Sequence, residues 1–317
     1  MKPRRIVLAL GGNAISTGDS SGDIPSQFNA SRSTAKYVAD LLCAGHHVLM
    51  THGNGPQVGM VLRRVELSRH EVYPIDLGLA VADTQAGMGY MICQCIRNEM
   101  ALRNEPVNAC TIVTTVEVAA DDPAFDNPTK PIGQYYDEAT AKSRVETDGW
   151  NVKEVPGQGW RRVVPSPRPL VIREQELIRH LFDQGRVVVC GGGGGIPIVA
   201  RADGTADGIE AVIDKDLTAT ELALGSGADT LAILTAVDKV CIDFGTPSEQ
   251  QLDELSVANA KRYLAEGQFP AGSMGPKIES CVRFIENSTE PNSQAIITSI
   301  EGCMDAIAGN GGTRIVK

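Results

Sequence analysis

Short apolar runs that end at glycine turns, separated by stretches with helical spacing, limit most strongly how this chain can fold. Residues 6–10 form one such run, which stops at Gly11, and residues 47–50 form another. Between them, residues 29–43 place apolar or small side chains at helical spacing, and Gly45 follows where a helix commonly ends. Continuous apolar runs are typical of strands buried on both faces, so this segment predicts a β-α-β unit with parallel strands.

The same alternation continues along the rest of the sequence. We expect helices near residues 80–102, 216–224, 258–265 and 278–286, and strands near residues 111–118, 186–190, 230–234, 240–243 and 295–298. Strands that alternate with helices predict an α/β fold with an open, mainly parallel sheet between helical layers. With 317 residues, 42% of them hydrophobic, the chain is long enough to bury a core of this kind.

Residues 120–165 interrupt this alternation. They are rich in proline and charged residues, and they contain both tryptophans of the sequence. A structureless loop of this length would be unusual in a compact domain, so we interpret the segment as a small inserted subdomain that protrudes as a lid. The alternative is a mobile surface excursion without a function.

Charge and cysteine usage exclude several classes of partner. The net charge is −10 with both signs interspersed, so no basic stripe is available for nucleic acid or for a membrane surface. No apolar segment reaches transmembrane length, and the run at residues 6–10 is too short for a signal-peptide core. The eight cysteines include no C-x-x-C pair, which is typical of reduced thiols, so we expect a cytoplasmic protein.

Four glycine-rich turns follow apolar runs or precede helical ones. They are residues 11–14 (GGNA), 53–59 (GNGPQVG), 191–195 (GGGGG) and 272–277 (GSMGPK). Because glycine lacks a Cβ atom, backbone N–H groups can converge on an anion there, and a following helix adds partial positive charge. A single turn of this type is more often an ordinary connection in an α/β fold, but four together indicate a phosphate site.

Two common nucleotide motifs are missing. The Walker A pattern fails because Pro276 separates Gly275 from Lys277, and no glycine set has the G-x-G-x-x-G spacing of dinucleotide-binding proteins. The five histidines show no metal-ligand spacing, so we expect no protein metal ligands, and for His52 we expect a structural role.

Two lysines beside these turns are better candidates for chemistry. Lys277 lies at an expected helix start, where the helix dipole disfavours a cation unless an anion is near. Lys215 lies between Asp214 and Asp216, whose carboxylates could both hold its ammonium group. Phosphoryl transfer needs mainly fixed positive charge around the moving group, which two oriented lysines would supply. The alternative for each is a solvated surface lysine beside an acidic residue.

Seven motifs together resemble the carbamate kinases of the amino acid kinase family, and they span essentially the whole chain in the order of that family. They are residues 10–14 (LGGNA), 52–59 (HGNGPQVG), 127–133 (NPTKPIG), 191–197 (GGGGGIP), 214–216 (DKD), 235–240 (TAVDKV) and 272–277 (GSMGPK).

The resemblance implies a single domain over residues 1–317, in which the N-terminal half binds the small substrate and residues from about 185 bind the nucleotide. It implies transfer of a phosphoryl group from carbamoyl phosphate to ADP, which forms ATP in the arginine deiminase pathway. It also implies a homodimer, and Mg²⁺ bound with the nucleotide through few direct protein ligands.

The resemblance assigns roles to single residues as well. The residues that it assigns to carbamoyl phosphate are Gly11, Gly12, Asn13, Gly53 and Asn54. The residues beside the transferred group would be Lys215 and Lys277, oriented by Asp216, together with Lys130 on the lid. The residues along the nucleotide would be Ala236, Val237, Asp238, Val240 and Met274.

One position separates this chain from other relatives. In acetylglutamate and uridylate kinases, the end of the first strand is similar to a K-x-G-G pattern. This chain has Ala9 at the position of that lysine, so Lys215 would supply the positive charge that the first strand lacks. Two alternatives remain: another small-molecule kinase of the family, and a relative that binds metabolites or nucleotides without turnover. For Cys241, the apolar neighbours favour a buried inert thiol over a reactive one.

Overall fold

The computed structural model describes residues 2–11, 23–270 and 272–317. Its largest element is an eight-stranded sheet whose strands pair in parallel, except for the antiparallel pair β16–β17. In spatial order the strands are β15 (Glu254–Ser256), β17 (Thr313–Val316), β16 (Gln294–Thr298), β12 (Thr230–Leu234), β1 (Arg5–Leu10), β2 (His47–His52), β9 (Val187–Val189) and β3 (Ala109–Thr111). The expected open, mainly parallel sheet is therefore confirmed.

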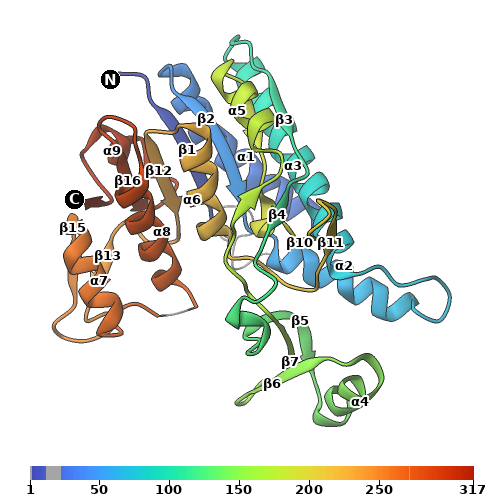
Figure 1. Ribbon diagram of the computed structural model, residues 1–317. Helices are drawn as coiled ribbons and strands as arrows, with labels where there is room; N and C mark the ends of the chain where they lie inside the picture. Colours follow the sequence, from blue (N-terminus) through green and yellow to red (C-terminus); the bar gives the residue numbers. More distant parts are fainter. Residues whose placement is uncertain (1, 12–22, 271) are drawn as a thin grey trace.

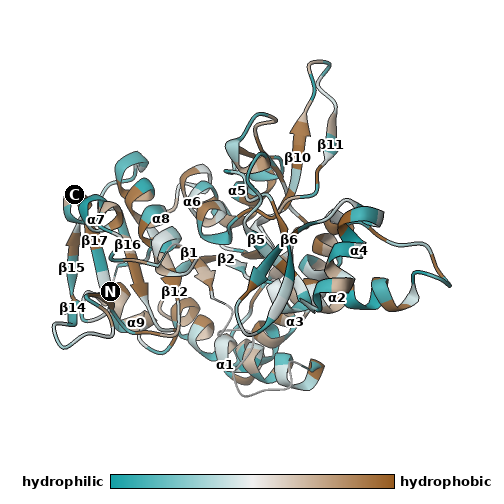
Figure 2. Cartoon of the chain, turned by 90° about the horizontal axis from the view of Figure 1, so that it is seen from below, coloured by the Kyte–Doolittle hydropathy of each residue, from teal (hydrophilic) through white to brown (hydrophobic). Residues whose placement is uncertain are grey.

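Helices cover both faces of this sheet (Figure 1). On one face lie α1 (Ile24–Cys43), α3 (Leu77–Leu102) and α9 (Cys303–Ala308); on the other lie α5 (Gln175–Asp183), α6 (Lys215–Ser226), α7 (Val257–Ala265) and α8 (Met274–Asn287). Successive strand residues belong to opposite cores: Ile6 and Leu8 pack with the first helix layer, and Val7 and Ala9 with the second. Figure 2 shows the hydrophobic character of central strands such as β1, β12 and β16.

Two expected strands differ from the structure. Residues 111–118 form no single strand: β3 ends at Thr111, and β4 (Thr115–Glu117) joins a separate four-stranded sheet of order β11-β10-β4-β8, with β8 (Val171–Ile172), β10 (Ile196–Ala200) and β11 (Ala206–Gly208). The chain turns because Gln85 of α3 bonds both the N–H (2.8 Å) and the C=O (3.2 Å) of Thr114. Likewise, β13 (Val240–Ile242) pairs only with β14 (Gln250–Leu252), outside the main sheet.

Three helices begin several residues earlier than we expected: α1 by five residues, α3 by three and α8 by four. Helix α3 begins at Leu77 because the Asp76 side chain caps it, accepting a bond from the Leu79 N–H at 2.7 Å. Helix α8 begins at Met274, so Pro276 is its third residue. Proline is tolerated there because the N–H groups of the first helical turn have no partner within the helix.

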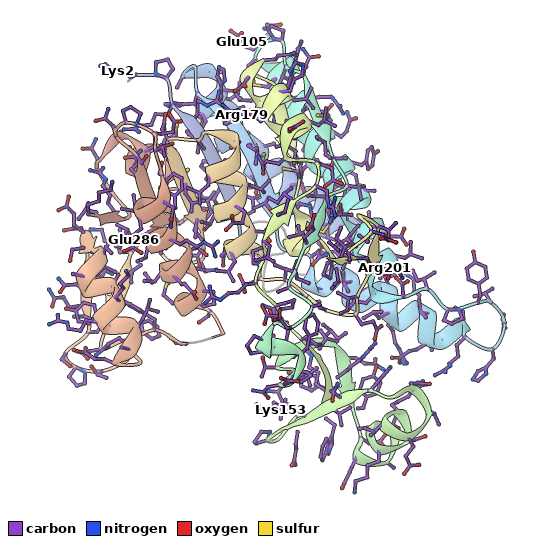
Figure 3. All side chains as sticks on the ribbon, viewed as in Figure 1. Lys2, Glu105, Lys153, Arg179, Arg201 and Glu286 are labelled. Atoms are coloured by element: carbon purple, nitrogen blue, oxygen red, sulfur yellow. The ribbon has the colours of Figure 1, made fainter. Side chains whose placement is uncertain are left out.

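Residues 120–165 contain a second folded unit, which projects from the body beside α2 (Gly55–Ser68) in Figure 1. After the short helix η2 (Pro123–Phe125) come β5 (Lys130–Tyr136), α4 (Glu138–Asp148), β6 (Asn151–Val155) and β7 (Gly159–Val164), with the strands paired in the order β5-β7-β6. We call residues 130–164 the lid. Its ribbon is mostly hydrophilic in Figure 2, and Lys153 marks it in Figure 3. Among the described helices, none combines the length and the apolar character that a membrane span requires.

Neighbouring residues of α5 allow a matched test of this packing. Ile178 is fully buried in the core that α5 shares with the sheet, whereas Leu177 is 52% exposed. We expect Ile178→Ala to lower the free energy of unfolding by about 2–5 kcal/mol, because it leaves a cavity, and Leu177→Ala to change it by less than about 0.5 kcal/mol. Chemical denaturation of both variants measures this, and equal shifts would contradict the packing described.

Candidate active site

Glycine turns meet at the carboxyl ends of the central parallel strands. Gly11, after β1, donates its N–H to the carbonyl oxygen of Leu234 at the end of β12 (2.9 Å), and a Cβ atom at Gly11 would lie 2.7 Å from that oxygen. After β2, the Gly53 N–H contacts the Leu10 carbonyl oxygen at 3.2 Å. Gly12 and Asn13, which we assigned to the substrate, lie outside the described residues.

The glycine run after β9 packs directly against the turn after β2. It contains the short helix η3 (Gly192–Gly194), where a Cβ atom would lie 2.5 Å from the His52 ring at Gly192 and 2.2 Å from the Asn54 side chain at Gly193. Gly193 also has a φ of +68°, which favours glycine. Side chains at these positions would displace His52 and Asn54, so close packing requires glycine here.

His52 and Asn54 are both buried beneath these turns. Burial lowers the pKa of His52 to about 4, so its imidazole is neutral near pH 7, and its Nδ1 lies 3.0 Å from the Gly53 carbonyl oxygen. The Asn54 amide donates to the hydroxyl of Thr84 at 3.0 Å. These contacts give His52 a structural place under the turn, in line with our expectation for it.

One carboxylate binds two lysines at the start of α6. Asp216 accepts a bond from the Lys215 ammonium group at 2.5 Å through Oδ1 and one from Lys277 of α8 at 2.7 Å through Oδ2. The three side chains are 4%, 14% and 13% exposed, in the order Asp216, Lys215 and Lys277. The two lysines are therefore not solvated surface residues, and Asp216 fixes both.

The protonation of this cluster follows from its burial and its charges. Burial alone raises the pKa of Asp216, but the adjacent Lys215 and Lys277 outweigh this effect and hold it below its usual value. Burial, with Lys277 nearby, lowers the pKa of Lys215, and the Asp216 carboxylate opposes that shift. Asp216 is thus a carboxylate near pH 7, and its negative charge favours the ammonium form of Lys215.

Asp214 connects this cluster to the lid. Its Oδ2 accepts a bond from Lys130, the first residue of β5, at 2.9 Å, and its Oδ1 caps α6 by accepting from the Asp216 N–H at 2.9 Å. We expected Asp214 to hold Lys215, but only Asp216 does so, because Asp214 faces the N-terminus of α6 and the lid. Three lysines and two aspartates leave this group with one net positive charge.

Comparison with known proteins identifies the family of the chain. The model of the amino acid kinase family matches residues 4–299. The chain belongs to the amino acid kinase family.

Its similarity to individual members extends over the full length. A carbamate kinase of Pyrococcus horikoshii is 43% identical over 99% of both chains, and the carbamate kinase-like protein YqeA of Escherichia coli is 44% identical over 99% of both. Among solved structures, a carbamate kinase from Giardia lamblia bound to AMP-PNP superimposes with a TM-score of 0.94 at 38% identity, covering 99% of both chains.

The residues that we assigned to the nucleotide lie in two parts of this family fold. Ala236, Val237 and Asp238 form an exposed turn after β12. Met274 begins α8 and packs partly against the core. Val240 is different, because its side chain is fully buried and its N–H donates to the Thr313 hydroxyl at 2.8 Å, so its side chain does not reach the surface of the site.

Sequence reasoning gave Asp214 only the role of a partner of Lys215, and it did not assign Gln85 to the site. Asp214 could have been found as a helix cap, since an aspartate directly before a helix start commonly has that role. Gln85 carries no such signal, because an isolated glutamine in an apolar helix reveals nothing of the strand end that it bonds 29 residues later.

Asp216 provides a test of the cluster with a defined pH dependence. We expect Asp216→Asn to lower the free energy of unfolding at pH 7 by about 3–5 kcal/mol, since it leaves buried ammonium groups without their carboxylate. Because the folded-state pKa lies below the usual 3.8, the stabilisation is complete above about pH 4 and is lost as the pH falls through the folded-state pKa. Chemical denaturation from pH 3 to pH 7 should therefore show the two proteins converging at low pH.

The matched control is Asp253→Asn, which removes the exposed carboxylate of the Lys239–Asp253 ion pair (2.5 Å). We expect it to change the free energy of unfolding by less than about 1 kcal/mol. An Asp216→Asn effect as small as that of the control would mean that Asp216 does not compensate the two lysines.

Proposed function

We propose that this chain is a carbamate kinase, which transfers a phosphoryl group from carbamoyl phosphate to ADP and thereby forms ATP. The observation that carries the proposal is the pair of lysines held by one buried carboxylate, beside glycine turns at the carboxyl ends of the parallel strands. The similarity to carbamate kinases over 99% of the chain supports the same conclusion.

The lysine cluster has donors left for a phosphate group. An ammonium group has three N–H donors, and Lys215 and Lys277 each use one of them on Asp216. The remaining donors can bond the equatorial oxygens of the phosphoryl group while it moves, which is the main requirement of this chemistry. Lys130, on the lid, would add a third positive charge from the other side.

The end of β1 supports a small anionic substrate in this branch of the family. The residue two positions before Gly11 is Ala9, whose side chain is fully buried in the sheet, so no lysine extends from this position toward the Gly11 turn. The positive charge comes instead from α6 and α8, through Lys215 and Lys277. Gly11, Gly53 and Asn54, together with Gly12 and Asn13, are the proposed partners of carbamoyl phosphate.

The proposed reaction is a direct in-line transfer without a covalent enzyme intermediate. Carbamate is already an anion, so the reverse attack on ATP needs no general base. The neutral, buried His52 fits this scheme as a support for the Gly53 turn. The proposed contacts of the nucleotide are Ala236, Val237, Asp238 and Met274. Val240 would contribute only by supporting the turn formed by residues 236–238.

Mg²⁺ is proposed to arrive with the nucleotide. Among the residues that the structure describes, no three or more His, Cys, Asp or Glu side chains gather as a metal site, and both oxygens of Asp216 bond lysines. A magnesium ion that takes its ligands mostly from phosphate oxygens and water fits such surroundings. It would neutralise phosphate charge during the transfer.

A homodimer in the cytoplasm, acting in the arginine deiminase pathway, completes the proposal. The edge strand β3 of the main sheet and the exposed apolar side chains Leu79, Tyr90 and Leu102 on α3 are compatible with a paired surface. The reduced state expected of the eight cysteines is compatible with the cytoplasm.

Enzyme assays decide the proposal. With carbamoyl phosphate, ADP and Mg²⁺, the protein should form ATP, quantified by chromatography of the quenched reaction, and omission of Mg²⁺ should abolish ATP formation. If it forms no ATP but phosphorylates acetylglutamate, aspartate or UMP, it is another kinase of the family. If it binds nucleotide without any turnover, it is a binding protein. Both alternatives have to be tested, because a protein named only carbamate kinase-like is 44% identical to this chain.

The lysines should account for turnover. We expect Lys215→Ala and Lys277→Ala each to lower kcat by roughly 100-fold or more, because each removes a charge that is fixed before the transfer begins. The matched control is Lys261→Ala, which breaks a surface ion pair with Glu286 on α8 and should leave kcat unchanged. Wild-type kcat in either folded lysine variant would remove the basis of the proposed mechanism.

A further inference from the structure

The last turn of α2 contacts the lid at two polar points. The Tyr136 hydroxyl, at the end of β5, donates to the Glu66 carboxylate. Arg69, directly after α2, bonds both carboxylate oxygens of Asp148 at the end of α4, each at 3.1 Å. A two-bond pairing of guanidinium and carboxylate fixes orientation as well as distance. Figure 1 shows α2 and the lid on the same side of the body.

The lid also packs against α2 and α3 at its base. Ile132 of β5 and Val164 of β7 are buried with Val58, Leu77 and Val81 in a small apolar cluster. Between this cluster and the polar contacts lies a cavity of about 210 Å³, whose walls include Leu62, Ile75 and Trp150. The middle of the contact is therefore not packed, and the lid is held around it by the two polar contacts with α2 and by the ion pair of Arg162 with Glu210 (2.6 Å).

Strand β5 connects these contacts to the lysine cluster. Lys130 begins the strand and Tyr136 ends it, and β7 pairs along its length despite a bulge between Ile132 and Tyr135. One strand thus carries both Tyr136, which contacts α2, and Lys130, which bonds Asp214. At its other end, α2 begins at Gly55, directly after the Asn54 turn. The helix thus spans from the proposed substrate turn to the lid.

We propose that Glu66 and Arg69 are positioning residues, which dock the lid on α2 through Tyr136 and Asp148 so that Lys130 stays paired with Asp214 beside the transferred group. Neither residue touches the lysine cluster in the structure; both act through the lid. The kinetic part of this inference rests on the proposed function, whereas the docking itself does not.

The first experiment measures docking without any enzymatic activity. Both tryptophans of the sequence lie in the lid, and Trp150 lines the cavity, so a Trp160→Phe background leaves one fluorescent reporter at the docked surface. In that background we expect Tyr136→Phe combined with Arg69→Gln to raise the acrylamide quenching constant of Trp150 by about twofold or more, since the surface opens to solvent. Arg69→Lys keeps the charge but loses the two-bond geometry, so its quenching constant should lie between those of the parent protein and the double variant.

The matched control is Glu138→Gln, which breaks the exposed Glu138–Lys142 pair within α4 (2.7 Å) and removes neither of the two polar contacts with α2. It should leave the quenching constant unchanged. Unchanged quenching in the docking variant, with circular dichroism like that of the wild type, would overturn the proposal, whatever the catalytic activity of the protein.

The second experiment asks whether docking acts through Lys130. We expect Tyr136→Phe with Arg69→Gln to lower kcat/KM for carbamoyl phosphate by about 10-fold while the KM for ADP stays within about twofold. In a Lys130→Ala background the same changes should have little further effect, because the residue that they position is already gone. Equal losses in both backgrounds would show that Glu66 and Arg69 do not act through Lys130.

The two experiments separate two kinds of failure. If the wild-type protein forms no ATP while the docking variants still expose Trp150, the proposed function is wrong and the docking stands. If ATP forms, the docking variants do not change the quenching of Trp150, and their effect on kcat/KM does not depend on Lys130, the docking proposal fails and the function stands.

Discussion

The buried carboxylate of Asp216 is the interaction on which the candidate site depends. Lys215 and Lys277 come from helices α6 and α8, whose starts are about 60 residues apart in the sequence, and they meet only because each of the two oxygens accepts one of them. A buried ammonium group without a counter-charge would be costly, and two such groups would repel each other. Asp216 therefore holds two buried positive charges side by side, which is the arrangement that the proposed phosphoryl transfer requires.

The parallel sheet explains why the other candidate residues gather nearby. Strands β1, β2, β9 and β12 are adjacent and point the same way, so the turns that follow them emerge at one edge. Close packing at that edge leaves no room for side chains at Gly192 and Gly193, where the ring of His52 and the amide of Asn54 already lie. The glycines thus bring backbone groups together where an anion would bind, and the buried polar side chains beneath them hold the turns in place.

Asp214 and helix α2 join the lid to this edge from two sides. Asp214 caps α6 and pairs with Lys130, so the same residue orders the helix that carries the lysine cluster and receives the lysine of the lid. Helix α2 runs from the Asn54 turn to the contacts with Tyr136 and Asp148. One helix therefore links the lid to the turn that we propose for the substrate.

Much of this protein could be predicted from the sequence, because hydrophobic periodicity and glycine placement are local signals. They indicated the parallel α/β sheet, the glycine turns after β2 and β9, and Lys215 and Lys277 as candidates, whereas the role of Asp216 as partner of both lysines was implied by the family resemblance. Other features depend on contacts between distant residues, which no local pattern contains. The break between β3 and β4 depends on Gln85, the burial of Val240 on the core cluster that it joins, and the pairing of Asp214 with Lys130 on where the lid lies. The sequence determined which residues could do chemistry, and the tertiary structure decided which of them meet.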